Sequence, residues 1–388
     1  MTQSIDRGAL RRSAPPILQN AFRPFFLGGA AWAALLVPLW AAEYLGWLGP
    51  SQGVAGHAHE MLYAVLAAIV CGFALTAIPN WTGRAPVAGQ GLAALFLVWL
   101  AGRLAFLAGD ATWHVLIDGS FLVVLALIVF REILSGKNWR NLPIAVLITL
   151  FAISHAAFHH PDLQAGAIRA TFGVAALLIA LIGGRIVPSF TRNWLAANAH
   201  PASQRMPSPM QVLDKMALGL TAVAILAWVG FPGHWANGIL MIGAGTAQLV
   251  RLARWQGLTT LREPLVWSLH AGFLWLFVAL VLIGSSAVWP QAVPAAAGVH
   301  ALAAGLIGSM TLAVMTRASL GHTGRPRTAN ILTTATYLLV HAGAIIRVIA
   351  AFAYNDPIWL GAAAGLWSAA FGLFALGYAP MLISPRRA

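Results

Sequence analysis

Charged residues are scarce in this chain. Of its 388 residues only 9% are Asp, Glu, Lys or Arg, whereas 60% are hydrophobic. A soluble domain averages about 25% charged residues. Because the deficit extends along the whole sequence, it argues against an ordinary soluble core and predicts a polytopic membrane protein.

Acidic residues are the scarcest of the charged ones, and the formal net charge is +13. In a soluble protein such an excess would suggest a nucleic-acid partner. In an apolar chain it is better explained by basic loops on one side of a bilayer. We therefore expect the lipid bilayer, and no nucleic acid, as a partner.

Cysteine is almost absent, because Cys71 is the single one. Intramolecular disulfides and Cys-based metal clusters are thereby excluded. The sequence up to residue 22 is polar and basic and lacks the short apolar core of a cleaved signal peptide, so we interpret 1–22 as a cytoplasmic tail.

What the chain has in abundance is apolar runs of about twenty residues, the length that spans a bilayer as a helix. The links between them are short, so we expect 23–384 to form a single transmembrane domain of about 12 helices. The predicted spans are 25–48, 57–79, 88–109, 112–134, 142–160, 166–188, 211–230, 234–254, 264–286, 294–318, 329–353 and 358–382.

The basic residues predict the orientation of these spans. With twelve spans, 20 of the 23 Lys and Arg residues fall on the side that holds both termini. Basic loops are retained in the cytoplasm. Both termini are therefore predicted to be cytoplasmic, and the exceptions are Arg103, Arg169 and Arg347.

An internal repeat relates the second and tenth spans. The segments 59–84 and 300–325 have equal length, start with His and end in Thr-Gly-Arg. Prolines open the first, fifth and ninth spans, at Pro24, Pro143 and Pro264. The pattern suggests three units of four helices, since repeats are common in membrane folds.

His59 and His300 occupy matching positions in this repeat. Because both spans run the same way, the two imidazoles are expected at the same depth and to bind one haem b iron between them. His57 points about 200° away from His59 on an ideal helix, so the two cannot share one iron. For any single histidine the alternative is a position at the wet membrane interface.

Further histidines extend the set of candidate metal ligands, which comprises His57, His59, His155, His270 and His300. His155 and His159 lie one turn apart on one helix face, although a wet helix end is the preferred explanation for His159 and His160. His270 and His341 fall within spans, and His341 is a candidate for cofactor binding. The remaining histidines are interpreted as boundary or loop residues: His114, His200, His234 and His322.

Two arginines, Arg103 and Arg347, fall inside predicted spans. They would suit the carboxylates of a haem, because guanidinium binds carboxylate in a bidentate way. The equal alternative is an ion pair with Glu43, Glu60 or Asp118. These three acids are also candidate proton carriers, and Glu60 is the candidate catalytic residue.

Six stretches stand out from the apolar background. They are FRPFFL (22–27), HAHEML (57–62), IPNWTGR (78–84), GGRIVPSFTRNW (183–194), EPLVWSLHAGF (263–273) and MTLAVMTRASLGHTGR (310–325). In this order they resemble the NnrS family over nearly the whole chain. Taken alone, the stretches at the ends of the second and sixth spans are better explained as basic helix ends on the cytoplasmic side.

The resemblance implies a bacterial inner-membrane protein that contains haem, with copper as a second candidate cofactor. It implies a link to denitrification and nitrosative stress, with nitric oxide as the small-molecule partner. It also marks the positions His57, His59, Glu60, His300 and His322. The electron donor, a quinol or a cytochrome, is not identified by the sequence.

Twelve helices in three groups of four also resemble the catalytic subunit of haem-copper oxidases and nitric oxide reductases. The sixth span departs from that pattern, because it carries Arg185 and no histidine. The favoured function is a nitric oxide reductase-like oxidoreductase. The alternatives are a nitric oxide sensor, an electron-transfer cytochrome or a transporter, since a fold does not establish a function.

Overall fold

The computed structural model describes residues 13–49, 53–109, 111–354 and 356–387. These residues form an all-α protein without strands, in which every long segment is helical. Only helices that satisfy their own backbone hydrogen bonds suit an apolar bilayer in such a chain. The twelve long segments are α2 (Phe22–Tyr44), α3–η2–α4 (Gly53–Thr82), α5 (Gln90–Ala108), α6 (Ala111–Ser135), α7 (Leu142–Phe158), α8 (Gln164–Ala197), α9 (Val212–Gly230), α10 (Trp235–Ala253), α11 (Pro264–Val288), α12–η6–α13 (Ala295–His322), α14 (Ile331–Phe352) and α15 (Pro357–Ile383).

Eleven of these segments in the described chain are long and apolar enough to cross a membrane. The chain is therefore a multi-pass membrane protein, as its hydropathy predicts. The remaining long helix, α10, lies at the predicted eighth span but is less apolar. Its polar residues face inward: Gln248 donates to Thr221 Oγ1 on α9 at 2.9 Å, and Arg251 pairs with Asp214 at 2.7 Å.

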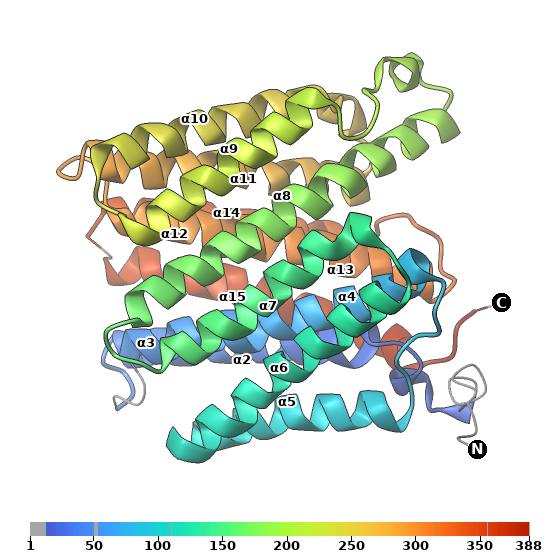
Figure 1. The fold of residues 1–388 in the computed structure, drawn as a ribbon, viewed down its shortest axis with the longest axis horizontal. Helices are drawn as coiled ribbons and strands as arrows, with labels where there is room; N and C mark the ends of the chain where they lie inside the picture. Colours follow the sequence, from blue (N-terminus) through green and yellow to red (C-terminus); the bar gives the residue numbers. More distant parts are fainter. Residues whose placement is uncertain (1–12, 50–52, 110, 355, 388) are drawn as a thin grey trace.

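The long helices run side by side in one bundle (Figure 1). The first and last spans are neighbours, because α15 packs along α2, while α10 packs along α11. Buried Arg23 at the start of α2 donates to the carbonyl oxygens of Leu382 and Ser384, each at 2.7 Å. The start of the first span and the end of the last span thus lie on the same side of the bundle, as an even number of crossings requires.

The sixth span is longer than predicted. It was expected to end at residue 188, yet α8 continues through Pro188 to Ala197. A proline inside a helix removes one hydrogen bond, and membrane helices tolerate that loss because neighbouring groups replace it. Part of the link between the sixth and seventh predicted spans is therefore helix, and the remainder contains the short turn η4 (Pro201–Arg205).

The repeated second and tenth spans share an unusual backbone. In each, a short α-helix is followed by a π-helical segment and then by a longer α-helix. The π-helical segments are η2 (Glu60–Leu66) and η6 (Ala301–Ile307), each of seven residues and each beginning directly after the matching histidine. Such segments are rare and occur frequently at functional sites. The same irregularity at the same register supports the internal repeat.

Short 3-10 turns complete the links. They are η1 (Pro16–Leu18), η3 (Trp139–Asn141), η4 and η5 (Gly257–Thr260).

Candidate metal centre and cofactor cavity

Four imidazoles meet inside the bundle, where α3, α6 and α7 converge. His59 Nε2 lies 3.1 Å from His155 Nε2, which in turn lies 3.3 Å from His159 Nε2. The ring of His114 is 4.7 Å from that of His59. His59 and His155 are almost completely buried. Isolated buried imidazoles are uncommon, so a cluster of four needs an explanation.

Asp118 completes this histidine cluster. Its Oδ2 lies 3.3 Å from Nε2 of both His59 and His155, and 3.7 Å from His114 Nε2. Within the described part of the chain, Asp118 Oδ2 and His114 Nε2 are buried without a hydrogen-bond partner. Leaving such groups unpaired costs free energy, so their convergence points to a bound ligand.

The spacing of the donor atoms fits a metal ion. Zinc–nitrogen bonds of 2.0–2.1 Å place two ligands of a tetrahedral ion about 3.3 Å apart. The observed separations of 3.1 and 3.3 Å match that value. Imidazole and carboxylate donors suit zinc, copper, iron or nickel. Cys71 is a free cysteine, and among the described residues it is not one of the candidate metal ligands.

A second layer of charged groups holds the cluster. Glu60 Oε1 lies 3.0 Å from His59 Nδ1, which leaves Nε2 to face the other donors. Arg103 donates to both carboxylate oxygens of Glu60 at 3.1 Å and also pairs with Asp118 Oδ1. Trp32 Nε1 donates to Glu60 Oε2 at 2.7 Å. A carboxylate behind a ligating histidine fixes the ring and raises its basicity.

Local sequence explains how the donors converge. His114 and Asp118 lie four residues apart on α6, and His155 and His159 lie four apart on α7, so each helix presents two donors on one face. The close approach of α5 to α6 needs a residue without a side chain. A Cβ on Gly102 would lie 2.9 Å from Asp118 Oδ1.

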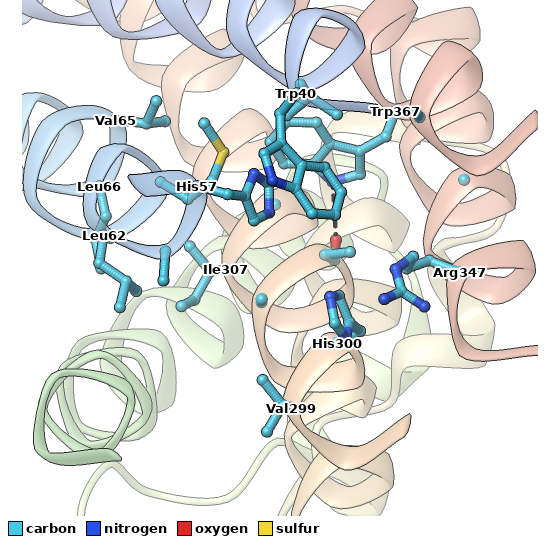
Figure 2. Close-up of a pocket in the computed structure, with 18 of the residues that line it drawn as sticks. Trp40, His57, Leu62, Val65, Leu66, Val299, His300, Ile307, Arg347 and Trp367 are labelled. Carbon is cyan, nitrogen blue, oxygen red and sulfur yellow. Dashed lines mark hydrogen bonds between the residues drawn. The ribbon is translucent and has the colours of Figure 1, made fainter. Parts of the chain in front are cut away.

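A separate cavity of about 260 Å³ contains the other two predicted histidines of the repeat. Figure 2 shows His57 and His300 in this cavity together with Trp40, Arg347 and Trp367. Most of the other lining residues are aliphatic or small. The cavity is therefore apolar, with a few nitrogen-bearing side chains at defined places, as small-molecule sites usually are.

The two cavity histidines are held in different ways. The ring of His57 stacks on Trp40, with centroids 4.0 Å apart and planes inclined by 26°. His300 Nδ1 lies 2.8 Å from the carbonyl oxygen of Ala296, so Nδ1 carries the proton and Nε2 offers its lone pair. Trp367 Nε1 donates to the carbonyl oxygen of Ala304, the dashed line in Figure 2.

The structure does not bring the expected pair His59 and His300 together. His59 faces α6 and α7 in the histidine cluster, whereas His300 lines the cavity with His57. The reason is the one that separates His57 from His59 on a helix: two residues rotate the side chain by about 200°. His57, not His59, therefore shares a cavity with His300.

The two arginines expected near a cofactor have different surroundings. Arg103 is fully buried and makes the alternative ion pairs, with Glu60 and Asp118, so it belongs to the histidine cluster. Arg347 lines the cavity beside His300 (Figure 2). It remains the arginine placed to meet an anionic group there.

His270 and His341 lie apart from both groups of residues. His270 Nε2 lies 2.7 Å from Thr191 Oγ1, and Trp275 Nε1 donates to His341 Nδ1 at 3.0 Å. Neither residue is among the cavity-lining residues or the candidate metal ligands of the described chain. Their expected roles as a metal ligand and a cofactor-binding residue therefore have no geometric support.

Sequence reasoning missed two donors and undervalued a third. His114 was interpreted as a boundary residue, Asp118 as an ion-pair partner and His159 as a wet helix end. The available signal was the pair of four-residue spacings, His114 with Asp118 and His155 with His159. That two such pairs face each other depends on tertiary packing.

The fold defines a class: an all-α, multi-pass membrane protein whose interior gathers histidines near the start of two repeated spans. The chain belongs to the NnrS family, described as NnrS protein, whose sequence profile matches residues 16–386. It is thus a membrane protein of a family linked to the nitric oxide response. No curated protein matches the chain.

Proposed function

We propose that the chain binds haem b in the cavity between His57 and His300 and acts there on nitric oxide, as a nitric oxide reductase-like oxidoreductase. The observation that carries this proposal is the shared cavity: two imidazoles from spans far apart in sequence line one apolar space beside Arg347. Haem, when bound, supplies an iron that binds nitric oxide and exchanges electrons.

The nitrogen-bearing side chains of the cavity are chemically suited to such a group. Within the described chain, His57 Nδ1 is a buried nitrogen without a hydrogen-bond partner, and His300 has its Nε2 lone pair available. Arg347 is suited to a propionate carboxylate, because its planar fork donates two parallel hydrogen bonds. Trp40 limits the movement of His57 by stacking on it. Nitric oxide is small and apolar, so it can enter from lipid without a polar cleft.

The histidine cluster would hold a second redox-active metal, with copper as the candidate. His59, His155, His159 and Asp118 would be its ligands. Glu60 is fully buried and already bound to His59, Arg103 and Trp32. In this proposal Glu60 is a positioning residue for His59, rather than the proton carrier that the sequence suggested.

Reductive turnover of nitric oxide consumes two molecules of NO, two electrons and two protons and yields nitrous oxide and water. The electrons would come from a quinol or a cytochrome. The bacterial inner membrane, with both termini cytoplasmic, is the location that the basic residues predict.

Cofactor analysis of three variants tests the assignment. Haem is measured as the pyridine haemochrome and metals by mass spectrometry, on wild type, His57→Ala, His300→Ala and His59→Ala. We expect the first two variants to lose haem and keep the second metal, and His59→Ala to do the reverse. Haem loss in His59→Ala alone would contradict the proposed cavity.

The non-enzymatic alternative has one specific observation in its favour. If His57 and His300 both ligate, no iron position stays open for nitric oxide, as in electron-transfer cytochromes. Optical spectra of the reduced protein with and without nitric oxide separate the cases. Consumption of nitric oxide with nitrous oxide formed supports the enzyme, binding alone indicates a sensor, and protein purified without haem favours a transporter.

A further inference from the structure

A second large cavity, of about 450 Å³, lies toward the end of the bundle opposite to the histidine cluster. Arg317 lies 17 residues after His300 on the tenth span, about 25 Å along a helix. The cavity collects parts of four of the six distinctive stretches: Phe26, Asn80, Arg185 and Arg317 all line it. It shares no described lining residue with the cavity of His57 and His300.

This inner cavity is strongly cationic. Arg185, Arg317, Arg327 and His322 line it, and the described lining contains no Asp or Glu. Arg317 and Arg327 repel each other electrostatically, and the carboxylate of Glu263 offsets part of this charge from outside the cavity lining. The charge of the cavity therefore calls for an anionic ligand.

Basic residues at cytoplasmic helix ends are ordinary, but these arginines are not simply exposed to water. Arg185 donates to Asn141 Oδ1 at 2.8 Å, and its Nε is buried without a partner in the described part of the chain. The guanidinium of Arg317 lies over the ring of Phe190, 4.0 Å from its centroid. Both side chains are half-buried within helices and border the cavity.

An apolar cavity of about 90 Å³ adjoins the cationic one. The two share the lining residues Phe73, Ile144, Ile182, Ile186 and Val314. The apolar part is lined by aliphatic residues, Phe73 and Met310, together with Thr311 and Gly183. A cationic space that continues into an apolar one is complementary to an amphiphile with an anionic head group.

We propose that this composite site binds an anionic phospholipid, with its phosphate between Arg185, Arg317 and Arg327 and the first few methylene groups of an acyl chain in the adjoining apolar cavity. Arginine suits the phosphate because it donates to two oxygens at once. Basic pockets between membrane helices on the cytoplasmic side are known to bind anionic lipid head groups.

Native mass spectrometry of the detergent-purified protein tests this site. The probes are dioleoyl phosphatidylglycerol and dioleoyl phosphatidylcholine at equal concentration. We expect one phosphatidylglycerol to bind in preference to phosphatidylcholine. Arg185→Gln and Arg317→Gln should each weaken its binding about fivefold. The matched control is Arg205→Gln, because Arg205 is exposed and does not line the cavity.

A second variant tests the apolar part without changing charge. Val314→Trp fills the junction of the two cavities, so it should weaken the binding of dioleoyl phosphatidylglycerol but not that of glycerophosphoglycerol, which has the same phosphate head group and no acyl chain. An unchanged melting temperature excludes misfolding. Equal binding of both dioleoyl lipids, displacement by millimolar inorganic phosphate, or no effect of either arginine variant would overturn the proposal.

Discussion

His59 Nε2 and His155 Nε2 lie 3.1 Å apart, although 96 residues separate them in the sequence. Two neutral imidazoles can share one hydrogen bond at that distance, but His159 Nε2 is a further 3.3 Å from His155 Nε2 and Asp118 Oδ2 is 3.3 Å from both His59 and His155. A metal ion would satisfy all these atoms at once, which a single shared proton cannot do.

Loss of one ligand should empty the proposed metal centre. We expect His155→Ala to lower bound metal from one equivalent to near zero while haem is retained, because His155 is central to the cluster. His160→Ala is the matched control, since His160 is exposed on the next turn. Metal content of the purified variants, measured by mass spectrometry, checks this expectation. Equal metal in both variants would leave the cluster as a hydrogen-bonded network.

A substitution of Glu60 distinguishes a role in positioning His59 from a role in carrying protons. Glu60→Gln keeps the shape but weakens the bonds to Arg103 and to His59 Nδ1. Replacing a group behind a metal ligand typically lowers metal affinity about 10- to 100-fold. We expect that loss in a competition titration with a chelator, whereas a pure proton carrier would slow turnover and leave metal affinity unchanged.

Gly102 tests the packing that places Asp118. In Gly102→Ala the new methyl group would lie 2.9 Å from Asp118 Oδ1, so α5 and α6 must separate or the carboxylate must move. We expect weaker metal binding and a lower melting temperature. Gly91→Ala on the same helix is the control, because its Cβ would meet no other atom within 4 Å. Similar behaviour of the two variants would rule out the steric argument.

Arg347 should influence the electronics of a haem in the cavity. A nearby positive charge stabilises the reduced, less positive iron, so its removal favours the oxidised form. We expect Arg347→Gln to lower the midpoint potential in a spectroelectrochemical titration. Arg347→Lys, which keeps the charge, should stay close to wild type. An unchanged potential in Arg347→Gln would place the haem away from this residue.

Asp214 stabilises α10, the least apolar of the long helices, through an ion pair. Arg251 is fully buried and pairs with Asp214 at 2.7 Å. Removing one partner of a buried pair typically costs about 3–5 kcal/mol because a charge is left uncompensated. We expect Asp214→Asn to lower the melting temperature in detergent clearly. The exposed Asp162→Asn should not, and a normal melting temperature in Asp214→Asn would show that Arg251 finds another partner.

The sequence was sufficient for the membrane architecture because apolar run length depends on bilayer thickness alone. It located the long helices to within a few residues, except where α8 continues through Pro188. The candidate site was predictable only in part. That His57 and His59 face opposite ways follows from helix geometry, and His155 was recognised by its spacing from His159.

The partners of these residues could not be derived from the sequence. Whether His59 meets His300 or His155 depends on which face of the second span packs against the tenth span and which against the fifth span, α7. No local pattern specifies this. The same holds for Arg103, whose ion pairs with Glu60 and Asp118 join three separate helices.

The π-helical segments that follow His59 and His300 have a consequence for sequence variation. A π-helical turn accommodates an extra residue compared with an α-helical one. Deleting a single residue from 60–66 or from 301–307 would therefore let the chain relax into a regular helix. Because the π-helical turn already absorbs the extra residue, the parts of the span on either side would keep their orientation, whereas the same deletion in a regular α-helical stretch would rotate one part by about 100° relative to the other. The positions of His59 and His300 should therefore tolerate a one-residue deletion inside these segments better than a deletion elsewhere in the same spans.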